Sequence, residues 1–234
     1  MNADLKHWRK AERDRLIAAR LALGDEQLAQ LRTRIDENLE RAFPGLAQRL
    51  VAFCWPIQNE YDARFLARRL RERGAKTALP VVVKYAQPLI FRSWKPGDVL
   101  ARGVYDIPYP PSGEAVVPDV ALVPMNGFDA GGYRLGYGGG FFDRTLAALR
   151  TGNRSRPVAI GITYEMARMQ TIHPQQHDIP MDYVVTERDV YQRGVEGLAF
   201  LDAPRMTHWT TGYSSPACLA SEIAPGYFGE DNNH

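Results

Sequence analysis

Apolar positions along the chain follow helical spacing first and then alternate between strand and helix. Residues 5–22 and about 25–42 place apolar side chains at helical intervals, so two helices are expected there. A short apolar run at 50–55 is typical of a buried strand, and the pattern at 61–73 predicts another helix. Strand, helix and strand in this order predict a crossover unit within a parallel sheet.

The rest of the chain continues this alternation. Further strands are expected at 77–83, 88–94, 119–125, 157–164 and 182–187. A glycine-rich segment at 127–140 precedes a helix at about 141–150, and residues 95–118 are expected to form a loop with a short hairpin. We therefore predict an α/β fold of three layers, with a mostly parallel sheet flanked by helices and closed by 157–164 and 182–187.

This pattern ends at about residue 202. A chain of 234 residues fits one large domain or two small ones, and we interpret residues 1–202 as a single α/β domain. Residues 203–234 show no periodicity and contain Pro, Gly, Ser and Asn throughout, which predicts an irregular C-terminal extension of unknown role. Its aromatic residues favour an arm packed on the domain over a disordered one.

Charge and cysteine content narrow the function classes. The 29 Lys+Arg against 27 Asp+Glu give a net charge of +2, which does not favour a nucleic-acid partner. Two cysteines cannot form a disulfide framework, and Cys54 lies in an apolar run where an inert core thiol is expected. The charged N-terminus and short apolar runs argue against a secretory signal and a membrane partner, so a cytoplasmic protein is expected.

The glycine-rich segment is the strongest chemical signal. Glycines between a strand and a helix let the backbone approach a ligand and direct N–H groups toward an anion. Arg134 adds a phosphate donor, and Asp143 in the first helical turn suits a divalent metal. The spacing fits neither G-x-G-x-x-G nor a P-loop, and a loop that merely lets two backbones cross is an equal alternative. The residues alone predict a phosphate loop of unspecified type.

Two sequence blocks add a family resemblance. The run GFD-x-x-G-x-RLG-x-G-x-G-x-x-D at 127–143 closely resembles the signature of the 5-formyltetrahydrofolate cyclo-ligase family. The second block comprises Ile-Gly-Ile-Thr-Tyr-Glu at 160–165, His-Asp-Ile-Pro-Met-Asp at 177–182 and Val-Val-Thr-Glu at 184–187. The resemblance covers about residues 6–190. It implies a three-layer α/β fold and ATP- and Mg²⁺-dependent conversion of 5-formyltetrahydrofolate to 5,10-methenyltetrahydrofolate, with release of ADP and phosphate.

The resemblance also implies roles for individual residues. Arg134 and Tyr137 would act in catalysis, and Asp143 and Asp178 would hold magnesium. The residues implied to hold ATP are Arg9, Lys10, Arg13, Arg134, Gly136, Tyr137, Gly138, Gly139, Gly140, Phe141 and Phe142. The residues implied to contact the folate are Glu60, Phe128, Tyr137 and Tyr164. Against these roles stand a helix N-terminal charge for Glu60 and core packing for the aromatic side chains.

The first helix carries a basic face that two interpretations fit. Lys6, Arg9, Arg13 and Arg20 fall within one narrow sector at 100° per residue. A solvated surface is the plain interpretation, but the family has a lysine and an arginine four residues apart that serve ATP. That spacing falls here on Arg9 and Arg13, so whether Arg9 or the neighbouring Lys10 contacts ATP stays open.

Two alternatives remain beside the cyclo-ligase hypothesis. His173, His177 and Asp178 have the spacing of transition-metal ligands, but Pro174 interrupts the helix such a site would need. A loop in which Asp178 faces magnesium is therefore favoured. The altered first helix also leaves open a non-catalytic or divergent nucleotide-binding protein on the same fold.

Overall fold

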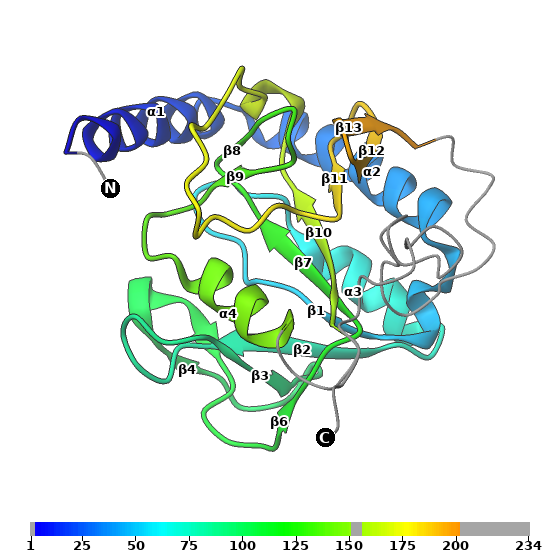
Figure 1. Ribbon diagram of the computed structural model, residues 1–234. Coiled ribbons are helices and arrows are strands. Elements are labelled where there is room, and N and C mark those ends of the chain that lie inside the picture. Colours follow the sequence, from blue (N-terminus) through cyan, green and yellow to red (C-terminus); the bar gives the residue numbers. More distant parts are fainter. Residues whose placement is uncertain (1–2, 151–155, 202–234) are drawn as a thin grey trace, which may run out of the picture.

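A computed structural model describes residues 3–150 and 156–201, which form a sheet covered by helices on both faces (Figure 1). The four α-helices of this part are α1 (Ala3–Leu21), α2 (Asp25–Ala42), α3 (Ala63–Glu72) and α4 (Phe141–Arg150). Each lies where the apolar spacing predicts a helix, with ends that differ by at most two residues. The three-layer α/β fold is thereby confirmed.

The main sheet has nine strands, ordered β13-β12-β11-β10-β7-β1-β2-β3-β6. Their bounds are β1 (Leu50–Ala52), β2 (Lys76–Val81), β3 (Ile90–Ser93), β6 (Ala115–Val116), β7 (Val120–Pro124), β10 (Val158–Ile162), β11 (Tyr183–Val185), β12 (Val190–Gly194) and β13 (Gly197–Phe200). Two small hairpins pair β4 (Ala101–Arg102) with β5 (Pro108–Tyr109), and β8 (Gly127–Phe128) with β9 (Arg134–Leu135).

Parallel pairing is confined to the middle of the sheet. Strands β2, β1, β7, β10 and β11 run parallel, whereas β3, β6, β12 and β13 join the two edges antiparallel. The expectation that residues 182–187 close the sheet is wrong, because a hairpin of β12 and β13 follows β11. These edge strands are partly exposed and carry mixed polar residues, so they lack the continuous apolar run of a buried strand.

Alternate residues of the central strands face opposite layers, which explains how one sheet serves two cores. Val120 and Leu122 pack in the core that α2 and α3 cover. The intervening Ala121 and Val123 pack in a second core with Leu146 of α4. Strands covered on both faces read as unbroken apolar runs, and this is the pattern by which they were predicted.

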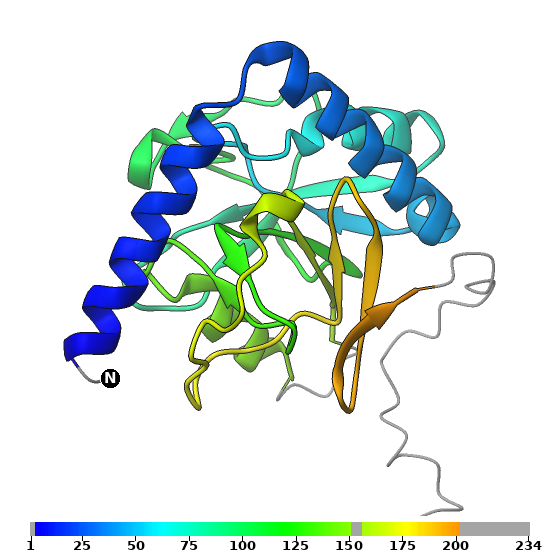
Figure 2. The ribbon, with the colours of Figure 1, turned by 90° about the horizontal axis from the view of Figure 1, so that it is seen from above.

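Helix α1 has a different role, because it flanks the body of the molecule instead of covering a sheet face (Figure 2). Its buried residues are Arg9, Leu16 and Arg20. The basic face of α1 therefore turns toward the protein at these two arginines, and the solvated-surface interpretation is wrong for them.

Two further expectations concern the ends and the surroundings of the chain. The predicted extension at 203–234, with Cys218, lies outside the described residues. Within the described ranges, the four helices include none that is both long and apolar enough to cross a membrane.

Candidate active site

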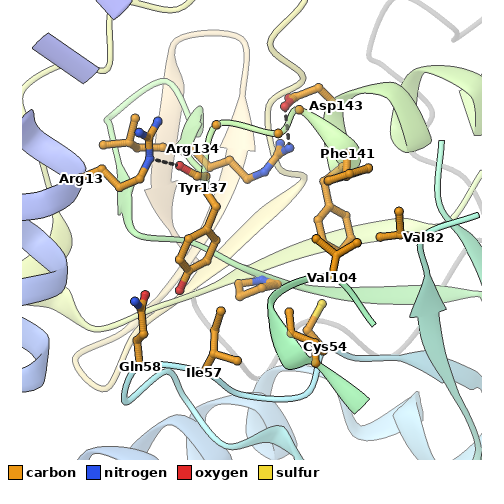
Figure 3. Close-up of a pocket in the computed structure, with 18 of the residues that line it drawn as sticks. Arg13, Cys54, Ile57, Gln58, Val82, Val104, Arg134, Tyr137, Phe141 and Asp143 are labelled. Atoms are coloured by element: carbon orange, nitrogen blue, oxygen red, sulfur yellow. Dashed lines mark hydrogen bonds and ion pairs between the residues drawn. The ribbon is translucent and has the colours of Figure 1, made fainter. Parts of the chain in front are cut away.

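A cavity of about 880 Å³ opens at the C-terminal ends of the parallel strands β1, β2 and β7 (Figure 3). One face of α1, the loop after β1, the glycine-rich turn and the start of α4 line it. Ligands of open α/β sheets bind at this end of the strands, because the loops that leave them converge there. The volume lies within the range of small-molecule sites.

The glycine-rich segment begins as the β8–β9 hairpin, which the sequence pattern did not predict. The buried Asp129 carboxylate fixes this hairpin by accepting the N–H groups of Gly131 and Tyr133 at 3.0 and 3.1 Å. Its second oxygen accepts the N–H of Ile172 at 3.1 Å. Asp129 thus joins the hairpin to the loop that leads to Asp178, and both segments reach the cavity.

After the hairpin, the turn exposes its backbone to the cavity. The N–H groups of Gly136 to Gly140 have no hydrogen-bond acceptor within residues 3–150 and 156–201. Gly138 and Gly140 have φ angles of 94° and 61°, a left-handed conformation that glycine adopts without strain. Arg13 of α1 donates to the Gly136 carbonyl at 2.6 Å, and Arg144 of α4 donates to the Gly139 carbonyl. Two arginines therefore hold the turn by its carbonyl oxygens, which leaves the N–H groups for an anion.

Arg134 and Asp143 form an ion pair at the floor of the cavity (Figure 3). Arg134 Nη2 lies 2.8 Å from Asp143 Oδ2, and their side chains are 4% and 18% exposed. Burial lowers the pKa of Arg134, while the carboxylate of Asp143 acts in the opposite direction. Asp143 also accepts the N–H of Ile179 at 3.0 Å, so its position is fixed from two sides.

A second pair joins Arg9 of α1 to Asp178. The guanidinium donates to Asp178 at 2.6 Å and to the carbonyls of Ile172 and His173 at 3.1 and 2.8 Å. Burial would raise the pKa of Asp178, but the hydrogen bonds from Arg9 and from a backbone N–H lower it overall. Lys10 also borders the cavity, with a side chain that is 68% exposed and paired with Asp14.

Glu60 and Tyr137 meet across the cavity from different segments. The Tyr137 hydroxyl donates to Glu60 Oε1 at 2.8 Å, and the N–H of Ile57 donates to Oε2 at 3.0 Å. Burial raises the pKa of Glu60, although these two donors and the charge of Arg20 oppose the rise. In Figure 3 the Tyr137 ring extends from the glycine turn toward Gln58 and Ile57.

The two carboxylates expected to hold magnesium, Asp143 and Asp178, both line the cavity. The described residues hold no group of three or more His, Cys, Asp or Glu side chains arranged for a metal ion. Magnesium in phosphate-transfer sites uses one or two carboxylates and takes its other ligands from phosphate and water. The donor set therefore fits a magnesium ion that enters with a nucleotide, and it does not fit the three-ligand transition-metal site.

Three predicted residues lie elsewhere than expected. Phe128 and Tyr164 are buried in the two cores and are not among the residues that line the cavity. Cys54, expected in the core, lines the cavity and is only partly buried. The end of β1 at Ala52 explains this, because the residues after the strand turn into the loop that borders the cavity.

Sequence reasoning gave no role to Arg20 and Arg144, which hold parts of the cavity wall. Arg20 belongs to the basic sector of the first helix, so its inward position follows from that pattern once Arg9 is known to face inward. Arg144 directly follows the matched motif and contacts a carbonyl five residues before it. Since a contact to a left-handed turn depends on backbone geometry, residue spacing does not predict it.

Comparison with known proteins places the chain in a family. The model of the 5-formyltetrahydrofolate cyclo-ligase family matches residues 5–187. The 5-formyltetrahydrofolate cyclo-ligase of Escherichia coli is 28% identical over 179 residues, which cover 74% of this chain and 97% of that protein. Its Mycolicibacterium smegmatis counterpart is 32% identical over 162 residues, 65% of this chain and 79% of the relative.

A solved structure agrees with these sequence matches. The NMR structure of Aquifex aeolicus 5,10-methenyltetrahydrofolate synthetase superposes with a TM-score of 0.67 and 27% identity. The match covers 86% of this chain and 99% of that structure. With the family model spanning the whole of the cavity's lining from α1 to Asp178, the chain belongs to the 5-formyltetrahydrofolate cyclo-ligase family.

Proposed function

We propose that this chain converts 5-formyltetrahydrofolate to 5,10-methenyltetrahydrofolate and consumes ATP in the presence of Mg²⁺. The formyl oxygen attacks the γ-phosphorus and ADP leaves. N10 then attacks the activated formyl carbon and loses its proton, and phosphate departs with the former formyl oxygen. Catalysis of this kind consists mainly of positioning the reactants and neutralising the phosphate oxygens.

The observation that most supports this proposal is the glycine turn beside Arg134. Consecutive backbone N–H groups without acceptors in the described residues suit the oxygens of a triphosphate, and Arg134 lies at the same wall. Phe141 and Phe142 border the cavity at the start of α4. We assign the ATP phosphates to this turn.

The basic face of α1 completes the phosphate side of the proposal. The Arg9 guanidinium already donates to Asp178 and to two carbonyls, whereas the Lys10 ammonium is mostly exposed at the cavity. We therefore assign the phosphate contact to Lys10 and Arg13, and to Arg9 the support of Asp178. Magnesium, when bound by Asp143 and Asp178, supplies neutralising charge for the phosphate oxygens.

Glu60 and Tyr137 form the folate side of the proposal. A carboxylate accepts the paired N–H donors of an aminopyrimidine ring, and Glu60 lies at the cavity with a fixed orientation. Tyr137 projects from the phosphate-binding turn to Glu60, so one side chain joins the two halves of the cavity. We propose that it aligns the formyl group with the γ-phosphate.

The test follows the ultraviolet absorbance of the methenyl product and the release of phosphate by the purified chain. We expect both signals only when 5-formyltetrahydrofolate, ATP and Mg²⁺ are all present. Omission of each component in turn provides the controls. A folded chain that binds ATP but gives neither signal would contradict the proposal and favour a divergent nucleotide-binding relative.

A further inference from the structure

Arg20 joins two walls of the cavity although it is not among the residues that line it. The side chain lies near the C-terminal end of α1 and is almost completely buried. Its Nε donates to the Gln58 carbonyl at 2.7 Å, and its Nη2 donates to the Tyr137 hydroxyl at 3.0 Å. Gln58 belongs to the loop after β1, whereas Tyr137 belongs to the glycine turn. One guanidinium thus connects both segments to α1.

The loop that Arg20 holds has an unfavourable backbone. Gln58 and Asn59 have φ angles of 49° and 58°, in the left-handed region that side chains disfavour. Such conformations persist where neighbouring contacts hold them, and they gather at functional sites. Glu60 follows directly and accepts the N–H of Ile57 within the same loop. The bond from Arg20 to Gln58 therefore helps to fix the carboxylate of Glu60.

Arg20 also sets the charge around Glu60. The Tyr137 hydroxyl accepts from Arg20 and donates to Glu60, so a cation, a hydroxyl and a carboxylate form one chain. Burial raises the pKa of Glu60, and the positive charge of Arg20 opposes that rise. The other titratable groups that act on Glu60 or feel its charge are Cys54 and Tyr164, whose pKa values are themselves raised by burial.

We propose that Arg20 is a positioning residue that holds Glu60 ionised and oriented toward the N–H donors of the folate ring. The inference rests on the proposed function, which supplies the folate. Arg20 does not contact the substrate in this arrangement. Its effect passes through the Gln58 carbonyl and the Tyr137 hydroxyl, so it concerns the folate half of the cavity and leaves the phosphate half unchanged.

The test compares Arg20→Gln and Arg20→Lys with the wild type. Loss of a hydrogen bond to a charged group leads us to expect a folate KM raised about tenfold or more in Arg20→Gln, with the ATP KM changed less than about twofold. Arg15→Gln is the matched control, because Arg15 is an exposed arginine of the same helix paired only with Glu12 in the described residues. It should behave as the wild type.

The pH profile separates positioning from a general loss of structure. Without the cation of Arg20, the pKa of Glu60 rises further, so the acidic limb of kcat/KM for folate should move to higher pH. Arg20→Lys keeps the charge and should leave this limb near that of the wild type. Its ammonium lacks the planar fork that reaches both acceptors, so the folate KM should still be raised.

Each outcome decides the question. An active wild type whose folate KM and acidic limb are unchanged in Arg20→Gln refutes the inference alone, as does an equal rise in both KM values. If Arg20→Gln is thermally less stable than the wild type, Arg20→Lys decides, and a normal folate KM there refutes the inference. A wild-type chain that forms no methenyl product refutes the proposed function and the inference together.

Discussion

Single residues in the cavity act mainly as paired charges. Asp143 and Asp178 are expected magnesium ligands, and each already has an arginine partner, Arg134 and Arg9. A buried charge that loses its partner is costly, because neither water nor a counter-ion replaces it. These carboxylates therefore support the protein structure as well as the proposed chemistry, and a substitution there affects both.

Asp143→Asn should separate these two contributions. We expect methenyl formation to fall to background, because the amide is a poor magnesium ligand. We also expect about 3 kcal/mol loss in unfolding free energy, because Arg134 would remain buried without its counter-charge. Denaturant unfolding and turnover at saturating Mg²⁺ provide the two measurements.

Glu72→Gln is the matched control for stability. Glu72 pairs with Arg68 on the exposed side of α3, so its loss should change the unfolding free energy by less than about 0.5 kcal/mol. Wild-type turnover in Asp143→Asn would remove Asp143 from the metal site that we propose.

At the residue scale, sequence reasoning succeeded where chemistry depends on residue type within a matched motif. Arg134, Asp143 and Asp178 all line the cavity as expected. It failed for Phe128, because an aromatic residue beside a glycine turn is equally suited to a pocket or to a core. The choice depends on the β8–β9 hairpin, which turns that side chain inward.

Among the elements, α1 is attached by polar contacts more than by apolar packing. Arg9, Arg13 and Arg20 hold three different segments, and Leu16 is the buried apolar residue of the helix. A helix held in this way has few apolar contacts to stabilise its ends. Its N-terminal half depends on Arg9.

Arg9→Gln should therefore loosen the first half of α1. We expect faster amide hydrogen exchange over residues 3–12, because the bonds to Asp178, Ile172 and His173 are lost or weakened. Exchange in α2, which packs through buried leucine and isoleucine side chains, should remain slow. Arg15→Gln again serves as the control. Unchanged exchange in residues 3–12 of the Arg9 variant would show that other contacts hold this half.

The elements themselves were largely predictable. The central strands are buried on both faces and read as apolar runs, and the helices show their spacing directly. The hairpin of β12 and β13 was not predicted, because an edge strand with one exposed face has a weak apolar pattern. The pairing direction of the edge strands likewise depends on loop paths that composition does not specify.

On the scale of the whole molecule, the sheet order determines where the cavity forms. Strands β1 and β7 are neighbours, so the loops that follow them deliver Glu60 and the glycine turn to one place. Helix α1 then spans both loops from the side (Figure 2). The family match ends at residue 187, and Leu201 packs at the margin of the main core.

A chain that ends after residue 202 should keep its activity. We expect wild-type kcat and KM values, since each residue assigned to ATP or folate lies before that position and the truncation keeps β13 and Leu201. The measurement is turnover of the shortened and full chains side by side. A shortened chain that folds but loses turnover would give residues 203–234 a part in catalysis.

The central claim is that ATP activates the formyl oxygen in this cavity, and an isotope label tests it most directly. The wild-type chain would be supplied with 5-formyltetrahydrofolate carrying ¹⁸O in the formyl group, together with ATP and Mg²⁺. We predict one ¹⁸O atom in the released phosphate for each methenyltetrahydrofolate formed. Unlabelled phosphate, or phosphate released without methenyl product, would contradict the account.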